Sequence, residues 1–443
     1  MTPVRPSSRD PLRTAGRPRI LVLRALGLGD LLTAVPALRA LRTAHPQHEL
    51  VLAAPRRLTE AALATGVVDR LLPASAPARG VPQVIDWTGP PPVLAVDLHG
   101  NGPASHLPLL ALRPARLFAY PHPATPRIAG PVWREDEHER SRWCRLLTWY
   151  GIPADPDDLR IEAPVEPCPA PGAVVVHPGA DAGARRWPPE RFAAVAHALH
   201  RAGHRVVITA GADEGPAARR VAAQAGLPPS AVLGGAADVP FGELAALVAG
   251  ARAVIVGDTG LAHLASALGT PSVVLFGPVA PRLWGPPRVP RHRVLWHPDH
   301  LDRARPGDAH GEQPDARLLR ITAAEVLTAV ARLPEPVRAP DRPRAAPDRP
   351  SGASARPSGV PDRLSDASDR PSSASDRPSS ASDRPSSAPD RPSSAPDRPD
   401  RTPDRPGRTP DRSAPAPAPV AAPDPPPAPN PVTAPAPAPA PVS

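Results

Sequence analysis

Short apolar runs alternate with amphipathic segments along most of the chain, and a Pro-rich stretch, APVEPCPAPG, divides this pattern into two parts. In the first part the pattern predicts strands at 20–23, 50–53 and 93–98 and a helix over 31–43. In the second part it predicts strands at 173–177, 205–209, 254–256 and 272–276, and helices over 187–203, 215–225, 241–249, 261–268 and 322–333. Strands alternating with helices in this way indicate open parallel sheets with helices on both faces.

The fold class is therefore α/β, with two Rossmann-like domains facing each other across a cleft. In such folds ligands bind at the carboxyl ends of the strands, so we expect the site to face that cleft. The expected segments are an N-terminal arm, two domains and a tail, at 1–17, 18–165, 170–333 and 334–443.

The tail is expected to be disordered. It repeats DRPSSAS and DRPSSAP with a seven-residue period, but no apolar seam marks a coiled coil. Its Pro, Arg, Asp, Ser and Ala residues bury too little apolar surface to offset chain entropy, which is typical of a disordered, partly polyproline-II segment.

The formal net charge of this 443-residue chain is +9, and all 52 basic residues are arginines. The absence of lysine excludes a P-loop lysine and a Schiff-base lysine. The arginines are dispersed among acidic residues, and aromatic residues make up only 3% of the chain, which disfavours a nucleic-acid-binding protein. Its two cysteines have no metal-binding or redox spacing, and no secretory signal or membrane-spanning run is visible. The sequence predicts a cytoplasmic protein with at most peripheral membrane contact.

One strand-to-helix turn has the character of an anion site. The apolar strand 254–256 runs into Asp258, Thr259 and Gly260, and a helix of small residues follows. Free backbone N–H groups at the positive end of a helix favour a phosphate-bearing ligand. The alternatives are that Asp258 only caps the helix and that His263 is structural.

Two further turns of the second part carry charged residues. Arg185 and Arg186 precede a helix, where paired guanidinium groups suit a diphosphate, although loop arginines are often only solvated. Trp187 is interpreted as a packing anchor. Glu214 follows a strand at the same edge; it either accepts hydrogen bonds from ribose hydroxyls or belongs to the acidic first turn of its helix.

The first strand leads into LGLGD, which ends at Asp30. A dinucleotide fingerprint fails here, because Leu32 occupies the third glycine position and no acidic residue follows at the ribose-binding distance, so a nicotinamide enzyme is disfavoured. Asp30 is either a plain helix cap or a carboxylate placed to take a proton from an incoming hydroxyl.

These motifs together resemble glycosyltransferase family 9, the heptosyltransferase family of GT-B enzymes. The matching stretches are LGLGD, HPG…RRWPPERF, the G-x-x-E of 211–214 and GDTGLAHLASALGTPSVVLFGP…WGP. The resemblance covers about residues 18–333 and excludes the tail.

The resemblance implies an inverting transferase that moves a sugar from a nucleotide donor, typically ADP-heptose, to the hydroxyl of a glycan or small-molecule acceptor. It makes Asp30 the general base and Glu214 the ribose contact. Arg185, with Arg186 beside it, stands where the family usually has a lysine that neutralises the diphosphate. The donor sugar and phosphate would bind at Asp258, Thr259, Gly260 and His263.

On the acceptor side the resemblance points to Gly29 and to the loop VDLHGNGPASHL, with His99 and Asn101. His99 stands where glutamine is common in the family, and the loop lacks the basic residue expected for an anionic lipopolysaccharide core. The long tail is not a family feature either.

Inversion requires one in-line displacement, a base for the acceptor and positive charge on the leaving diphosphate. Arginine and helix N–H groups supply that charge, and no Asp-x-Asp metal motif is visible, so no metal and no cofactor are expected. Two alternatives remain: another GT-B nucleotide-sugar enzyme, such as an epimerase or phosphorylase, and a non-catalytic protein that binds nucleotide sugars.

Overall fold

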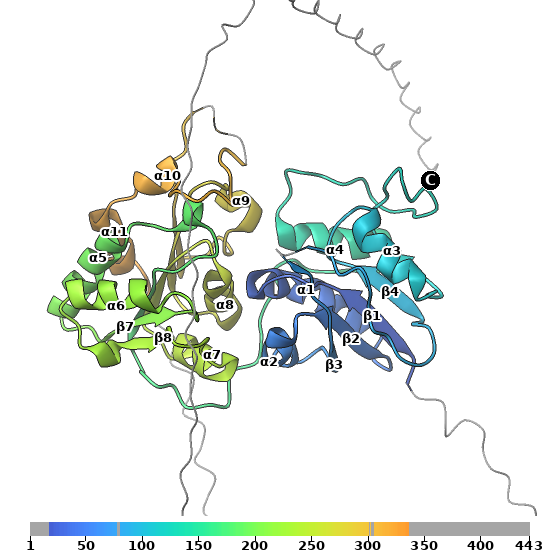
Figure 1. The fold of residues 1–443 in the computed structure, drawn as a ribbon, viewed down its shortest axis with the longest axis horizontal. Helices are drawn as coiled ribbons and strands as arrows, with labels where there is room; N and C mark the ends of the chain where they lie inside the picture. Colours follow the sequence, from blue (N-terminus) through green and yellow to red (C-terminus); the bar gives the residue numbers. More distant parts are fainter. Residues whose placement is uncertain (1–16, 78–79, 301, 303–304, 336–443) are drawn as a thin grey trace, which may run out of the picture. The chain divides into compact units, whose positions relative to one another are not determined.

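The computed structural model describes residues 17–77, 80–300, 302 and 305–335. The predicted arm and tail therefore lie outside the described residues, apart from residue 17 of the arm and residues 334 and 335 of the tail. The described residues contain two parallel sheets, one in each half, which we call the N-terminal and C-terminal lobes (Figure 1).

The N-terminal lobe has a five-stranded sheet in the order β3-β2-β1-β4-β5. Its strands are β1 (Arg19–Leu23), β2 (Glu49–Ala54), β3 (Arg70–Pro73), β4 (Leu94–Asp97) and β5 (Leu117–Phe118). Its helices are α1 (Leu28–Ala44), α2 (Thr59–Leu63), α3 (Pro103–Ala111) and α4 (Glu139–Trp149). Every pairing is parallel, and β1 lies between β2 and β4. The strand order reverses beside β1, where α/β sheets bind ligands.

The C-terminal lobe has a six-stranded sheet in the order β11-β10-β9-β6-β7-β8, again parallel throughout. Its strands are β6 (Val174–His177), β7 (Val206–Ala210), β8 (Val232–Gly234), β9 (Ala253–Gly257), β10 (Ser272–Leu275) and β11 (His292–Leu295). Its helices are α5 (Pro189–Arg201), α6 (Gly215–Gln224), α7 (Phe241–Ala249), α8 (Gly260–Leu268), α9 (Pro281–Trp284), α10 (Ala316–Leu319) and α11 (Ala323–Ala331). The order reverses between β6 and β9, which makes their carboxyl ends the expected ligand edge.

Both faces of each sheet are covered, which explains why the central strands are apolar at every position. In β1, Ile20 and Val22 belong to one buried cluster and Leu21 and Leu23 to another on the opposite face. The central strand β6 alternates in the same way. The predicted class of two Rossmann-like α/β halves is confirmed, while the exact domain boundaries remain predictions.

Helix α1 also packs on the other lobe. Its residues Leu32 and Val35 are buried in the same cluster as Leu261 and Leu264 of α8. The core of the C-terminal lobe is therefore completed in part by a helix of the N-terminal lobe.

The start of α1 differs from the prediction. The helix begins at Leu28, not at Leu31, so Asp30 is its third residue and does not occupy the N-cap position. Gly27 occupies the N-cap position in an extended conformation, and its N–H donates to the Asp30 carboxylate at 3.0 Å. The carboxylate thus satisfies a free helix N–H from inside the first turn.

Two local predictions of the second half are confirmed. Thr322 and Glu325 form the expected reciprocal capping box at the start of α11. Trp187 is 1% exposed, donates to the carbonyl of Ile321 and stacks edge-on against Phe192, so it is a packing anchor.

Candidate functional site

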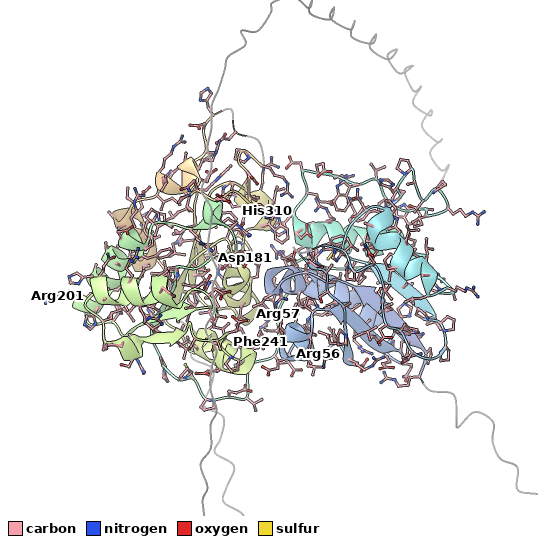
Figure 2. The ribbon with its side chains drawn as sticks, viewed as in Figure 1. Arg56, Arg57, Asp181, Arg201, Phe241 and His310 are labelled. Atoms are coloured by element: carbon pink, nitrogen blue, oxygen red, sulfur yellow. The ribbon has the colours of Figure 1, made fainter. Side chains whose placement is uncertain are left out.

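A cavity of about 910 Å³ lies between the two lobes, at the carboxyl ends of β1, β6, β7 and β9. Figure 2 labels residues of both walls: Arg56 and Arg57 belong to the N-terminal lobe, and Asp181, Phe241 and His310 to the C-terminal lobe. The predicted site residues that line it are Gly29, Asp30, Arg185, Glu214, Asp258, Thr259, Gly260 and His263. Arg186, His99 and Asn101 do not line it.

The first turns of α1 and α8 meet at this cavity. A Cβ atom on Gly29 would lie 2.8 Å from Cδ2 of His263, and one on Gly260 would lie 3.2 Å from Cβ of Leu28. Both glycines are therefore needed for the close approach of the two helices. Two positive helix ends then border one cavity, which favours a ligand with several negative charges.

Asp30 lies at this junction and is 6% exposed. Its Oδ2 accepts the Gly27 N–H at 3.0 Å, and its Oδ1 lies 3.5 Å from Nη2 of Arg24. The carboxylate is thus held on both oxygens at the wall contributed by the N-terminal lobe.

The two predicted arginines separate in the structure. Arg185 ends a short 3-10 helix (Gly183–Arg185), lines the cavity and donates from Nη1 to the Asp258 carbonyl at 3.3 Å. Its Nε is buried and has no hydrogen-bond partner among the described residues. Arg186 is exposed and donates from Nε to the carbonyl of Ala180 at 2.8 Å. Of these two arginines, only Arg185 offers its guanidinium group to a ligand in the cavity.

The turn after β9 supplies two polar side chains to the cavity. Burial raises the pKa of Asp258 to about 6, against the opposing charge of Arg185 and Arg305. Thr259 occupies the N-cap position of α8, but its side chain makes no capping bond, and its buried Oγ1 has no partner among the described residues. A buried hydroxyl without a partner costs free energy unless a ligand or water satisfies it.

His263 faces the cavity from the first turn of α8. Burial lowers its pKa to about 4, so the imidazole is neutral at neutral pH. Its ring also packs edge-on against Trp284, with the ring centroids 5.9 Å apart. The packing on Trp284 supports the structural interpretation of this histidine, and its role in donor binding remains a prediction.

Glu214 lines the cavity at the N-cap position of α6. Its Oε2 accepts the Gly211 N–H at 2.8 Å and lies 4.0 Å from Nε2 of His177. The carboxylate sits directly over Gly179, where a Cβ atom would approach it to 2.1 Å.

Several cavity residues were not singled out from the sequence. Arg56 and Arg57 form a 3-10 helix after β2, and Arg305 approaches Asp258 from the C-terminal lobe. Arg56 and Arg57 could have been found from the sequence, because they follow the carboxyl end of the predicted strand 50–53. Phe241 and Leu244 of α7 add an apolar wall.

The predicted acceptor loop lies behind the cavity wall. Nδ1 of His99 accepts the Ala25 N–H at 3.1 Å, and burial lowers the pKa of this imidazole to about 4. His99 thus links the ends of β1 and β4. It is placed to support the loop before Asp30, and its role in acceptor binding remains a prediction, as does that of Asn101.

Residues 152–304 match the sequence profile of glycosyltransferase family 9 (heptosyltransferase). The chain is 34% identical over 163 residues to lipopolysaccharide heptosyltransferase 3 of Escherichia coli; this covers 36% of the chain and 46% of that protein. The structure resembles ADP-heptose lipopolysaccharide heptosyltransferase II of E. coli, with a TM-score of 0.55 and 20% identity over 71% of this chain and 97% of that one.

Residues 152–304 are thus similar to glycosyltransferase family 9, and the fold is similar to that of a solved heptosyltransferase. A heptosyltransferase of E. coli solved with ADP has the same fold, with a TM-score of 0.52 and 19% identity over 71% of this chain and 99% of that one. The predicted GT-B architecture is therefore confirmed. In sequence, the chain spans less than half the length of the curated relative it matches.

Two further observations apply to the described part of the chain. No helix there is long and apolar enough to cross a membrane. No group of three or more His, Cys, Asp or Glu side chains within the described ranges is arranged to hold a metal ion.

Proposed function

We propose that this protein is a family 9 glycosyltransferase that transfers heptose or a related sugar from an ADP-linked donor to an acceptor hydroxyl, with inversion and without a metal ion. The observation that carries the proposal is the single cavity that places Asp30 on one wall and Arg185 and the N-terminus of α8 on the other.

The donor occupies the wall of the C-terminal lobe. The diphosphate binds the N-terminal turn of α8 and the guanidinium of Arg185. The Nε of Arg185 has no partner among the described residues and can donate a hydrogen bond to a phosphate oxygen. Glu214 accepts hydrogen bonds from the ribose hydroxyls. The hydroxyl of Thr259 and the carboxyl of Asp258 also line the cavity, and they bind the sugar and its phosphate.

Asp30 acts as the general base on the opposite wall. It removes the proton of the acceptor hydroxyl as the oxygen attacks the anomeric carbon in line with the departing ADP. Arg185 and the two helix ends stabilise the charge that develops on the leaving diphosphate. These groups provide positive charge without a metal ion.

The acceptor is a glycan that enters beside Asp30 from the N-terminal lobe. Arg56 and Arg57 line the cavity on that side, where they supply the basic charge that the loop around His99 lacks. Guanidinium pairs bind phosphate or carboxylate groups of an anionic glycan through forked hydrogen bonds.

Calorimetric titration with ADP, UDP and GDP tests the donor site directly. We expect ADP to bind more tightly than the other two, with the same Kd in the presence of magnesium and of EDTA. Release of ADP from ADP-heptose, with water or added glycans as acceptors, then tests the reaction. Binding of none of the three nucleotides would contradict the donor site, and an epimer formed without transfer would favour the alternative enzyme class.

A Gly179→Ala variant tests the position of Glu214. The new Cβ would lie 2.1 Å from the carboxylate, so Glu214 must move away from the ribose position. We expect the Kd for ADP to rise about tenfold, the effect of one or two lost hydrogen bonds to a charged group.

Glu214→Ala is the matching variant for Gly179→Ala. If both act through the same carboxylate, the double variant binds ADP no more weakly than Glu214→Ala alone. Fully additive losses in the calorimeter would show that Gly179 acts in another way.

A further inference from the structure

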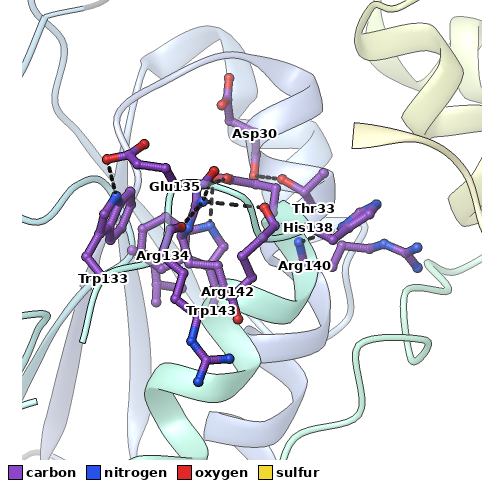
Figure 3. Close-up of polar contacts among 12 residues, drawn as sticks. Asp30, Thr33, Trp133, Arg134, Glu135, His138, Arg140, Arg142 and Trp143 are labelled. Atoms are coloured by element: carbon purple, nitrogen blue, oxygen red, sulfur yellow. Dashed lines mark hydrogen bonds and ion pairs between the residues drawn. The ribbon is translucent and has the colours of Figure 1, made fainter. Parts of the chain in front are cut away.

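Four buried charged side chains of alternating sign run from the cavity into the N-terminal lobe. They are Asp30, Arg24, Glu139 and Arg142, and we call them the charge row (Figure 3). Their exposed fractions are 6%, 1%, 5% and 3%, respectively. Buried ion pairs stabilise a fold no better than apolar packing does, so such a row requires another reason for being there.

Arg24 holds both the backbone and the side chain of Asp30. Its Nε donates to the Asp30 carbonyl at 3.1 Å, and its Nη2 lies 3.5 Å from the Asp30 Oδ1. The Thr33 hydroxyl donates to the same carbonyl at 2.9 Å, one turn further along α1. The first turn of the helix and its carboxylate are therefore fixed by one planar guanidinium.

Glu139 of α4 fixes Arg24 in turn. Its Oε1 accepts from Nη2 of Arg24 and from Nε1 of Trp143, each at 2.9 Å, and its Oε2 accepts from Nη1 of Arg142 at 2.7 Å. The indole of Trp143 also lies 4.9 Å from the guanidinium carbon of Arg24. With these contacts, Arg24 has no room to rotate away from Asp30.

Arg142, the last member of the charge row, lies in α4 and contacts the segment before that helix. Its Nη2 donates to the carbonyl of Arg134 at 2.8 Å, and its guanidinium carbon lies 4.1 Å from the ring of Trp133 (Figure 3). Asp30, Arg24 and Arg142 are thus tied to backbone groups, and of the charge row only Asp30 lines the cavity.

We propose that Arg24 and Glu139 are positioning residues that hold the Asp30 carboxylate in the orientation needed to accept the proton of the acceptor hydroxyl. This inference rests on the proposed role of Asp30 as the base. A base displaced by about 1 Å loses much of its effect, which explains why a costly buried row is kept beside it.

Other titratable side chains near Asp30 differ from Arg24 in charge. His99 and His263 are buried and neutral at neutral pH, and Asp258 is of the same sign as Asp30. Arg24 and Glu139 are the charged side chains in the row that link Asp30 to a second helix.

The test compares Arg24→Lys and Glu139→Gln with Arg145→Lys, the control. Arg145 lies on the same helix as Glu139 but is held by Glu137, with Nη2 2.6 Å from Oε2. The assay is hydrolysis of ADP-heptose, in which water replaces the acceptor, together with calorimetric binding of ADP. A lysine keeps the charge of Arg24 but cannot reproduce its fork.

We expect Arg24→Lys and Glu139→Gln to lower kcat by about 10- to 100-fold, while KM for ADP-heptose and Kd for ADP change less than about twofold. Arg145→Lys should leave all three values unchanged. In an Asp30→Asn background, Arg24→Lys should cause no further loss, because the carboxylate it orients is gone.

A merely structural role gives a different pattern. The variants would then lose activity only in proportion to unfolded protein, with kcat per folded molecule unchanged, and the positioning role would be wrong even if Asp30→Asn is inactive. If the wild-type protein neither binds ADP nor hydrolyses ADP-heptose, the proposed function fails, and the positioning role is overturned with it.

Discussion

Replacing Asp30 by Asn is expected to lower kcat for ADP release from ADP-heptose by about 100- to 10,000-fold, the usual contribution of a general base. The amide keeps the size of the carboxylate, and its oxygen still accepts the Gly27 N–H, so the first turn of α1 is preserved. The amide cannot take up the acceptor proton. Steady-state rates of ADP release, measured with saturating donor, check this prediction.

The same variant must retain donor binding. Asp30 belongs to the N-terminal lobe, whereas the proposed diphosphate contacts are Arg185 and the N-terminus of α8. We therefore expect the Kd for ADP to stay within about twofold of the wild-type value. Turnover at the wild-type rate would show that another group removes the proton.

Replacing Arg185 by Ala is expected to weaken ADP binding by about 10- to 100-fold, the effect of losing charge-assisted hydrogen bonds to a diphosphate. The loss in kcat/KM should be larger still, because the charge on the diphosphate grows as the glycosidic bond breaks. Calorimetry and initial rates of donor turnover measure the two effects separately.

Arg186→Ala is the matched control for Arg185→Ala. This neighbouring arginine is exposed, donates to the carbonyl of Ala180 and does not line the cavity, so its loss should leave ADP affinity nearly unchanged. Arg185→Lys keeps the charge and should lie between wild type and alanine. If Arg186→Ala proves the more damaging of the two alanine variants, the assignment of the diphosphate contact must be reversed.

The fold was predictable because the central strands are buried on both faces. A strand such as β6 is an uninterrupted apolar run in the sequence. Glycine and proline residues mark where such a run ends and the next helix begins. The assembly of the site followed from the same pattern, since residues placed after parallel strands meet at one edge. Arg185, Glu214 and Asp258 line one cavity for this reason, whereas Asp30, at the edge of the other sheet, reaches it because α1 packs against α8.

The features that escaped prediction have physical explanations. Helix α4 was missed because the first turn of its buried face carries charged residues, Glu139, Arg140 and Arg142, and the apolar residues of that face begin only at Trp143. The start of α1 was misplaced because a glycine can hold the N-cap position while an aspartate three residues later satisfies it. The different placements of Arg185 and Arg186 depend on the direction of two adjacent side chains, which composition does not encode.

Because α1 packs against α8, the two lobes share part of one apolar core. The match to the family profile falls on residues 152–304, which suggests that the C-terminal lobe could fold without the N-terminal lobe. However, Leu32 and Val35 of α1, in the N-terminal lobe, form part of the apolar core of the C-terminal lobe. Splitting the chain at the Pro-rich stretch near residue 168 would expose apolar surface on each fragment. The smallest unit that can be transplanted or recombined with its solubility intact is therefore the pair of lobes.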